Sequence, residues 1–393
     1  MKQMIPVIPV ILLLAGCGGS ETPNSKQTVD ACFETSNDAF SCSDMIKDIV
    51  KDAQGLAGQL KSDLTQLKTD VDAYCADINT PALQDAAQLQ WQTTMANVQQ
   101  LEVMQFDVIA QKRDEFYIWP SNDTCKTDLQ VASNPSGTDD ISQVANGRRG
   151  LTAVEYILYQ DDVTQSCADT YDAVDTWINS TNQTTRQEAR CDYASSIVEN
   201  LIVQAGDLET SLSSLDLEAE SDSLQEAANA ISNALFYIDK QTKDAKLIAA
   251  LPQDSNGTFN ADVLESQYAF NSKAHIKNNL LAAKNILAGD SGLGLNAYLT
   301  AKGQSDLAQE MLDAIDNVIE NIDAISGDLH TVISSANNVS ECINTTTYQS
   351  GDSNIVKVCA LQKNLKTFTD LLKEDFILAL SFSKPSDASG DND

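Results

Sequence analysis

Residues 146–159 (Asn-Gly-Arg-Arg-Gly-Leu-Thr-Ala-Val-Glu-Tyr-Ile-Leu-Tyr) place one acidic side chain inside an apolar helical pattern. Apolar residues recur at the three- and four-residue spacing of a buried helical face, at Leu151, Val154, Ile157 and Leu158. Thr152 precedes Glu155 by three positions and Tyr156 by four, so these polar side chains would be neighbours on one helix. Such a group could bind a cation or a polar ligand, and its oxygen atoms suit Ca²⁺ or Fe³⁺ better than Zn²⁺. The alternative is a half-exposed helical glutamate that binds nothing.

A glycine stands directly before this predicted helix. Gly150 would let the backbone turn tightly, where a β-carbon would obstruct either the turn or a ligand. The amides of the first helical turn favour a nearby negative charge. We therefore expect Glu155 to be ionised, to be a weak metal ligand, and to lie in the wall of a cleft.

The segment Gly150-Leu151-Thr152-Ala153-Val154-Glu155-Tyr156 resembles the Gly-x-His-x-x-Glu motif of the imelysin family. Other segments follow in the family's order, among them Tyr117-Ile118-Trp119-Pro120, Arg190-Cys191-Asp192-Tyr193 and Leu264-Glu265-Ser266-Gln267-Tyr268. The family comprises bacterial surface and periplasmic proteins that are classed as peptidases and linked to iron uptake. The resemblance implies a surface or periplasmic protein linked to the acquisition of iron or another metal, with iron or calcium as the metal ion. Thr152 stands at the position of the motif histidine, so transition-metal affinity should be weaker than the family pattern implies.

The chain is poorly equipped for hydrolysis. A hydrolytic zinc site needs about three protein ligands and a general base, but the only histidines are His275 and His330. The sequence also contains no Gly-x-Ser-x-Gly or His-Glu-x-x-His motif. We predict a non-catalytic binding protein. An imelysin-type metallopeptidase and a structural or partner-binding lipoprotein stay open as alternatives.

Three further residues are predicted to form the wall of the same site. Trp119 lies in an aromatic run and could equally be a core residue. Arg149 follows Arg148, and the two arginines could instead neutralise Glu155 or another carboxylate. His275 could replace the missing motif histidine from across a domain interface, or could be a surface histidine.

The N-terminus is predicted to be a lipoprotein signal. Lys2 precedes an apolar run over residues 5–14, which is shorter than the roughly 18–20 residues of a membrane-spanning helix. Leu14-Ala15-Gly16-Cys17 then reads as a lipidation site, so residues 1–16 would be removed and residues 17–30 would form a lipidated tether. Gly18 follows the cysteine, which favours the outer membrane, on its periplasmic face or at the cell surface. A protein partner in that membrane is then also expected.

Charge and cysteine content exclude several functions. The chain has 57 acidic and 25 basic residues and a net charge of −32, which disfavours nucleic-acid binding. Eight cysteines follow Cys17, and an even number in an exported protein indicates disulfides. Cys342 and Cys359 flank a turn between two predicted helices, so they are the pair with the strongest geometric basis.

The fold class predicted from periodicity is all-α, with two helical bundles packed side by side. Residues 31–205 would form the N-terminal bundle, residues 206–384 the C-terminal bundle, and residues 385–393 an acidic tail. The first long helix begins near Ser43 and shows a seam of apolar residues at alternating four- and three-residue spacing. Later helices are predicted over residues 224–251, 261–287, 307–342 and 355–380. No run of alternating residues is long enough to indicate a sheet.

Overall fold

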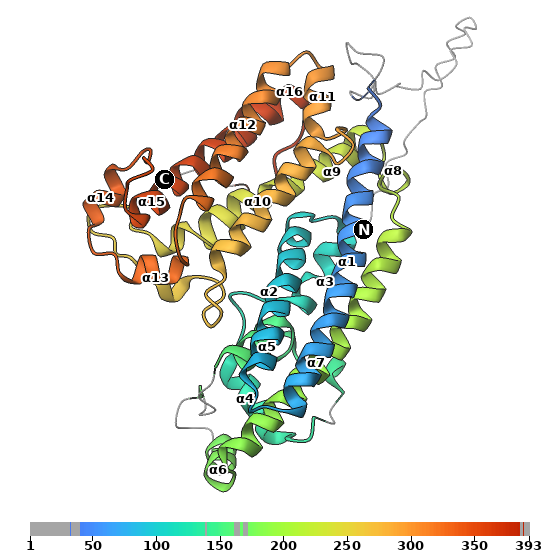
Figure 1. The fold of residues 1–393 in the computed structure, drawn as a ribbon. Coiled ribbons are helices and arrows are strands. Elements are labelled where there is room, and N and C mark those ends of the chain that lie inside the picture. Colours follow the sequence, from blue (N-terminus) through green and yellow to red (C-terminus); the bar gives the residue numbers. More distant parts are fainter. Residues whose placement is uncertain are drawn as a thin grey trace, which may run out of the picture.

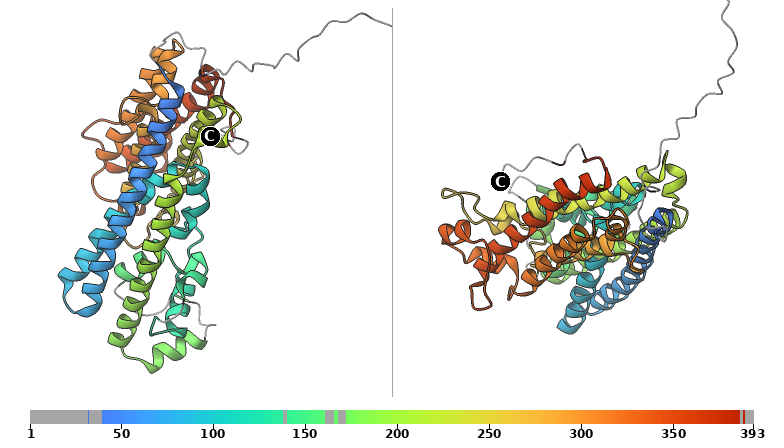
Figure 2. Two further views of the ribbon diagram at one scale, coloured as in Figure 1. Left: turned by 90° about the vertical axis from the view of Figure 1, so that its right-hand side faces the viewer. Right: turned by 90° about the horizontal axis from the view of Figure 1, so that it is seen from above.

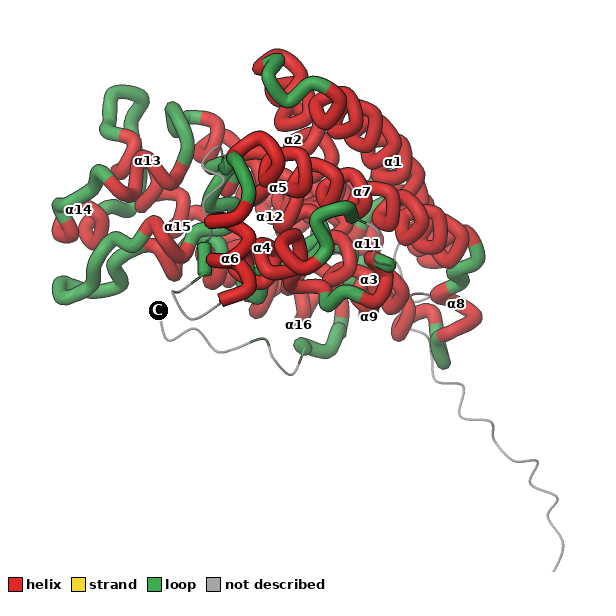
Figure 3. The backbone as a smooth tube through the Cα atoms, turned by 90° about the horizontal axis from the view of Figure 1, so that it is seen from below, coloured by secondary structure: helices red, strands yellow, loops and turns green. Residues whose placement is uncertain are grey.

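A computed structural model describes residues 32, 40–137, 140–160, 166–167, 172–385 and 388. Within these ranges the regular structure is entirely helical, and Figure 3 contains no strand. The predicted all-α class is therefore confirmed. The predicted signal peptide, Cys17 and most of the acidic tail lie outside the described residues.

Three long helices form the frame of the N-terminal half. The helix α1 (Cys42–Ala76) packs against both α2 (Pro81–Val103) and α7 (Gln183–Ser213), as Figures 1 and 2 show. Ser41 begins α1 because its hydroxyl accepts a hydrogen bond from the amide of Asp44. The predicted apolar seam of α1 is buried against these two helices. Burial of this stripe, more than helix propensity, stabilises such long helices.

Shorter helices fill the space beside that frame. They are α3 (Asp107–Phe116), α4 (Thr124–Ser133), α5 (Leu151–Tyr159) and α6 (Asp172–Ser180), with 3₁₀ turns η2 (Ile141–Gln143) and η3 (Asn146–Arg148). The helix α5 carries the Gly150–Tyr156 motif and is buried over its first eight residues. A helix buried on every side is a core element, so its polar residues must find partners inside the protein.

The C-terminal half contains a second group of helices, drawn from yellow to red in Figure 1. Its α-helices are α8 (Leu217–Glu220), α9 (Leu224–Tyr237), α10 (Ser272–Ala288), α11 (Leu295–Ala301), α12 (Ser305–Asp323), α13 (Leu329–Ser334), α14 (Val339–Asn344), α15 (Asn354–Leu371) and α16 (Ile377–Leu380). Two π-helical stretches, η4 (Ile238–Ala245) and η7 (Leu372–Phe376), and two 3₁₀ turns, η5 (Ile248–Ala250) and η6 (Ala261–Val263), complete the group. The helix α10 packs on both α2 and α12, so it joins the two groups.

Several predicted boundaries differ from the observed ones. The helix predicted over residues 307–342 is three separate helices, α12, α13 and α14. The helix predicted over residues 224–251 changes to a π-helix after Tyr237 and ends at Ala245. The helix predicted from residue 261 begins only at Ser272, after an irregular loop over residues 264–271. No break occurs at Gly206, where the sequence suggested a junction between halves, because α7 continues to Ser213.

Four disulfides join all eight cysteines that follow Cys17. The pairs are Cys32–Cys42, Cys75–Cys191, Cys125–Cys167 and Cys342–Cys359. The predicted Cys342–Cys359 pair is therefore confirmed. No helix among the described residues is long and apolar enough to cross a membrane.

Candidate functional site

A pocket of about 470 Å³ opens beside α5, between segments from both halves of the chain. The N-terminal half contributes Thr152 and Glu155 from α5 and the residues around Trp119 from the segment after α3. The C-terminal half contributes Ala245 from η4, Ala249 from η5, and residues 262–264 and 266–268. We call this cavity the Glu155 pocket. A water molecule occupies about 30 Å³ in the liquid. The pocket is many times larger, so it has room for a small organic ligand.

The carboxylate of Glu155 is held by the loop over residues 264–271. Its Oε1 atom accepts hydrogen bonds from the Ser266 hydroxyl at 2.8 Å, the Ala269 amide at 3.0 Å and the Tyr268 amide at 3.1 Å. Its Oε2 atom has no hydrogen-bond partner among the described residues, while Glu155 lines the pocket. One oxygen therefore fixes the loop and the other is available to a ligand.

The pKa of Glu155 is shifted in the direction opposite to that expected from the helix dipole. Burial raises the pKa of this carboxyl above its ordinary value. The donors Ala269 and Ser266, the charge of His275 and the Tyr268 amide only partly offset that effect. Glu155 is 3% exposed and forms no salt bridge with a lysine or arginine among the described residues. The first-turn amides of α5 are not its partners, so the dipole does not control its charge.

The turn that positions α5 depends on Gly150. This residue has φ of +89°, and a β-carbon at this position would lie 3.0 Å from the carbonyl oxygen of Phe116 at the end of α3. A side chain would therefore meet both strain and a backbone clash. Two residues later, Thr152 is 4% exposed, and its hydroxyl has no hydrogen-bond partner among the described residues. Because Thr152 also lines the pocket, a ligand could supply that partner.

A second buried glutamate lies at the start of the same loop, in a different electrostatic environment. The Oε1 atom of Glu265 is 3.2 Å from Lys246 Nζ, and its Oε2 atom is 3.0 Å from His275 Nδ1. Lys246 also contacts Glu102 Oε2 at 2.9 Å and donates to Gln99 Oε1 at 2.5 Å. Burial alone would raise the pKa of Glu265, but Lys246 and His275 lower it to about 2. We call these residues the Glu265 cluster.

His275 belongs to the Glu265 cluster and does not line the pocket. Its side chain is fully buried, with the ring 5.9 Å from that of Tyr117 in an edge-on arrangement. Tyr117 does line the pocket, so His275 lies behind the pocket wall. Burial and nearby carboxylates, Glu265 first, raise the pKa of the Tyr117 hydroxyl well above its ordinary value. The alternative of a surface histidine is wrong, because His275 is in the core.

The remaining predicted site residues are divided between the pocket and the core. Trp119 is half-buried and lines the Glu155 pocket. Arg149 does not line it: its guanidinium donates to Asn146 Oδ1 at 2.9 Å and to the carbonyl oxygen of Ile141 at 2.9 Å. Its suggested role as the counter-ion of Glu155 is therefore wrong, because it caps the preceding turns instead.

Tyr156 points into a separate buried network. Its hydroxyl donates to Asp128 Oδ2 at 2.9 Å, and Arg190 Nη2 donates to the Tyr156 hydroxyl at 2.9 Å and lies 2.7 Å from Asp128 Oδ1. The amide and hydroxyl of Ser166 also donate to Asp128 Oδ2, at 2.8 and 3.1 Å, and the network ties α4, α5 and α7 together. Thr152 and Glu155 thus lie on the pocket side of α5, and Tyr156 lies on the core side.

The loop residues that hold Glu155 are not among the predicted site residues. Ser266, Tyr268 and Ala269 fall within the helix predicted over residues 261–287 but lie in an irregular loop. Ser266 and Phe270 have positive φ angles of 59° and 52°, which no local glycine signals. The one sequence signal for these residues is that Ser266 and Tyr268 belong to a segment that resembles the imelysin family.

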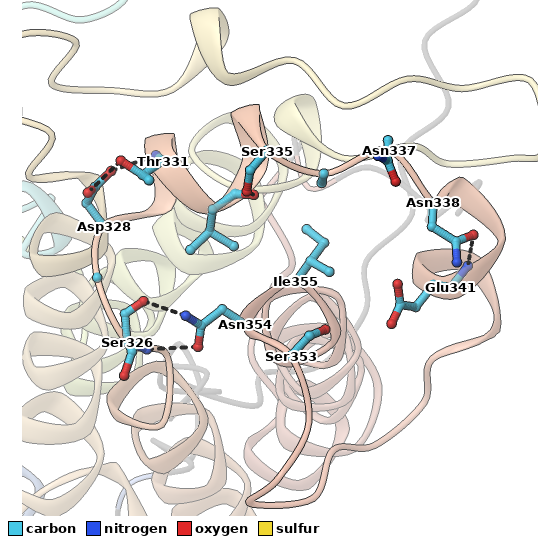
Figure 4. A pocket seen from close by; sticks show the side chains of 13 residues that line it. Ser326, Asp328, Thr331, Ser335, Asn337, Asn338, Glu341, Ser353, Asn354 and Ile355 are labelled. Atoms are coloured by element: carbon cyan, nitrogen blue, oxygen red, sulfur yellow. Dashed lines mark hydrogen bonds between the residues drawn. The ribbon is translucent and has the colours of Figure 1, made fainter.

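A second cavity, of about 350 Å³, lies among α13, α14 and α15 (Figure 4). Its polar side chains largely serve the helix ends around it. Asp328, Asn338 and Ser353 cap α13, α14 and α15. Asn354 forms two hydrogen bonds with the backbone of Ser326, and Figure 4 draws both as dashed lines. Glu341 is the lining carboxylate whose side chain has no hydrogen bond among the described residues. Helix capping therefore accounts for most of the polarity of this cavity.

The residues at the Glu155 pocket do not fit a tightly held transition metal. Such a metal requires about three protein ligands at close range, and the described residues contain no group of three or more His, Cys, Asp or Glu side chains with that arrangement. The pocket offers one free carboxylate oxygen of Glu155, the Thr152 hydroxyl and the exposed carboxylate of Asp262. The nearest imidazole, that of His275, is already beside Glu265.

Comparisons with known proteins agree with this architecture. The chain has the fold of an imelysin-like protein from Psychrobacter arcticum 273-4, with a TM-score of 0.64 and 15% identity over 88% of this chain and 96% of that one. It also resembles a protein from Parabacteroides distasonis ATCC 8503, described as an iron-regulated protein A precursor. That TM-score is 0.53, with 18% identity over 86% of this chain and 97% of the other. No curated protein matches the chain.

The family match covers both the pocket and the Glu265 cluster. Residues 54–357 match the family described as Imelysin. This range contains α5, the loop over residues 264–271, and every residue that lines the Glu155 pocket. The chain therefore belongs to the imelysin family.

Proposed function

We propose that this protein is a non-catalytic, ligand-binding member of the imelysin family that serves in the acquisition of iron or another metal. The observation that carries the proposal is that the two carboxylate oxygens of Glu155 have different surroundings. Three donors hold Oε1, while Oε2 is without a hydrogen bond among the described residues and lies at the wall of a 470 Å³ pocket. The connection with iron comes from the Parabacteroides protein described as iron-regulated.

The proposal includes export and a lipid anchor at Cys17. Four disulfides are typical of proteins that fold in an oxidising compartment. The leader and the Leu14-Ala15-Gly16-Cys17 segment support a lipid-anchored protein of the outer membrane. A Cys17→Ser variant should leave the membrane fraction or remain unprocessed. Unchanged membrane partition at the normal mature size would contradict this part of the proposal.

The donor set favours binding over peptide hydrolysis. Thr152 supplies a hydroxyl where the family motif has an imidazole, and Glu155 already uses one oxygen to hold the loop. These groups alone carry no positive charge, whereas in metallohydrolases a tightly held metal ion lowers the pKa of the attacking water. We therefore assign no hydrolytic step to the pocket.

Calorimetry and a cleavage assay test the binding role against the peptidase alternative. Ca²⁺ and Fe³⁺ are titrated into the wild type, Glu155→Gln and Thr152→His, and peptide cleavage is followed with and without a chelator. We expect weak metal binding in the wild type, weaker binding in Glu155→Gln and stronger binding in Thr152→His, because imidazole is the better ligand. Chelator-sensitive cleavage that disappears in Glu155→Gln would favour the peptidase. Identical behaviour of all three proteins towards metal ions and organic ligands would favour a structural role.

A further inference from the structure

We propose that the ligand of the Glu155 pocket is an organic cation with an alkylammonium group, which Glu155 and the aromatic wall would hold together. This inference rests on the proposed function, because it names the chemical class of ligand for the same pocket. It starts from the three kinds of lining residue that the pocket combines. These are carboxylates, aromatic rings, and side-chain acceptors without hydrogen-bond partners among the described residues.

The charge of the pocket is negative and is not neutralised by its walls. Glu155 and Asp262 line it, and its lining contains no lysine, arginine or histidine among the described residues. Lys246 is close in the fold, but it is fully buried and bound to Glu102 and Glu265. The whole chain carries a net charge of −32, so the field around the opening also attracts cations.

The pocket combines acceptors without partners with a few donors, the amide of Asn122, the indole N–H of Trp119 and the hydroxyls of Tyr117 and Thr152, which form no hydrogen bond among the described residues. The Ser266 hydroxyl is used on Glu155, and the Gln267 side-chain amide donates to the carbonyl oxygens of Ala261 at 3.1 Å and Leu264 at 2.5 Å. Glu155 Oε2 and Gln267 Oε1 are then left as acceptors without partners among the described residues. A ligand with N–H donors finds two acceptors there, and the carboxylates of Glu155 and Asp262 would repel an anion.

The aromatic wall distinguishes an organic cation from a bare metal ion. Tyr117, Trp119 and Tyr268 all line the pocket, and Trp119 and Tyr268 are partly exposed. Aromatic faces attract ammonium groups and also cover their alkyl carbons. A metal ion gains nothing from rings and needs several close oxygen ligands, and a volume of about 470 Å³ is far larger than one ion requires.

The shared chemistry could come from a free amine or from the side chain of a lysine in a peptide, and the experiment includes both. Binding of n-butylammonium, spermidine and an N-acetyl-lysine amide is measured by NMR titration of the whole mature protein, with n-butanol as the uncharged counterpart of butylammonium. The variants are Glu155→Gln, Trp119→Leu and Trp119→Phe. Glu341→Gln is the matched control, because Glu341 lies in the other cavity without a side-chain hydrogen bond among the described residues.

We expect butylammonium to bind the wild type at least about tenfold more tightly than butanol, since a charge-assisted hydrogen bond is the main anchor. Glu155→Gln should weaken butylammonium binding by about tenfold or more, and Trp119→Leu by a few-fold with partial rescue in Trp119→Phe. Glu341→Gln should behave as wild type. Tighter binding of spermidine than of the lysine amide would identify a free amine as the source, and the reverse order would identify a peptide. Circular dichroism and thermal unfolding of each variant verify folding.

Three results would overturn the inference, with different consequences for the proposed function. Equal affinity for butylammonium and butanol, with Trp119-dependent binding of both, would show a neutral-ligand pocket and leave the binding function intact. Metal ions that bind through Glu155 while no amine binds would also reject only the ligand class. If neither amines, alcohol nor metal ions respond to Glu155→Gln, the proposed function fails together with the inference.

Discussion

Glu155 and Glu265 are both at least 97% buried, and Glu155 contacts the loop that contains Glu265, yet their surroundings are opposite. Glu265 lies between Lys246 and His275, and its pKa falls to about 2. Glu155 has hydrogen-bond donors but no paired cation, and burial raises its pKa. The charge of Glu265 is paired inside the protein, so this residue serves the fold. Glu155 has no salt bridge among the described residues and one oxygen at the pocket, so it is available for binding. The same residue type thus has two roles in one small region.

The largest expected effect comes from breaking the compensated cluster. Glu265→Gln removes the charge that His275 and Lys246 face in the core, and only Glu102 stays beside Lys246. Loss of one partner from a buried ion pair costs roughly 3–5 kcal/mol, so we expect a fall of about 3 kcal/mol in the free energy of unfolding. Urea unfolding measures it. A loss below about 1 kcal/mol would show that the Glu265 cluster does not support the fold.

The second effect is a reversal in pH dependence between the two glutamates. Glu265 has a lowered pKa, so its contribution is present above the unfolded-state value near 4.5 and is lost as the pH falls towards about 2. Glu155 has a raised pKa, so the folded state binds its proton more tightly than the unfolded state does. The wild type should therefore lose stability relative to Glu155→Gln as the pH rises above about 4.5.

Unfolding free energies of the wild type and both glutamine variants, measured from pH 3 to pH 8, check this reversal. At pH 7 the Glu155→Gln variant should differ from wild type by less than about 1.5 kcal/mol, because the glutamine oxygen can accept the same three hydrogen bonds. Parallel pH curves for the two variants would contradict the comparison.

The smallest expected effect is at Thr152, on the pocket side of α5. Thr152→Val keeps the shape and removes a buried hydroxyl that has no hydrogen-bond partner among the described residues. Replacement of such a group by a methyl is nearly neutral, so the free energy of unfolding should change by less than about 0.5 kcal/mol. A loss above about 1.5 kcal/mol would show that the hydroxyl has a structural partner, and Thr152 would then belong with the framework.

Periodicity predicted the long helices of the molecule, because the face that a helix buries against its neighbours appears in the sequence as regularly spaced apolar residues. The seam of α1 and the Thr80-Pro81 start of α2 are local signals of helical packing. The turn at Gly150 was also readable, since its φ of +89° requires a residue without a β-carbon.

The loop at residues 264–271 could not be predicted in this way. Ser266 and Phe270 adopt positive φ angles without a glycine, because contacts with Glu155, more than 110 positions away in the sequence, hold the loop. Long-range contacts of this kind override local propensity. For the same reason, the prediction that Arg149 lies beside Glu155 was wrong, and the contact between His275 and Glu265 could not be predicted.

The most direct measurement is a carboxyl-carbon NMR titration of Glu155 and Glu265 in one isotope-labelled sample, assigned with the two glutamine variants. The uncompensated carboxyl of Glu155 should titrate above the ordinary glutamate value of 4.5, and the Glu265 signal should move only near pH 2. Addition of butylammonium should lower the pKa of Glu155 and leave that of Glu265 unchanged, because a bound cation favours the charged form. If Glu155 titrates at or below 4.5 and does not respond to the amine, its charge is already compensated within the fold and the site assignment is wrong.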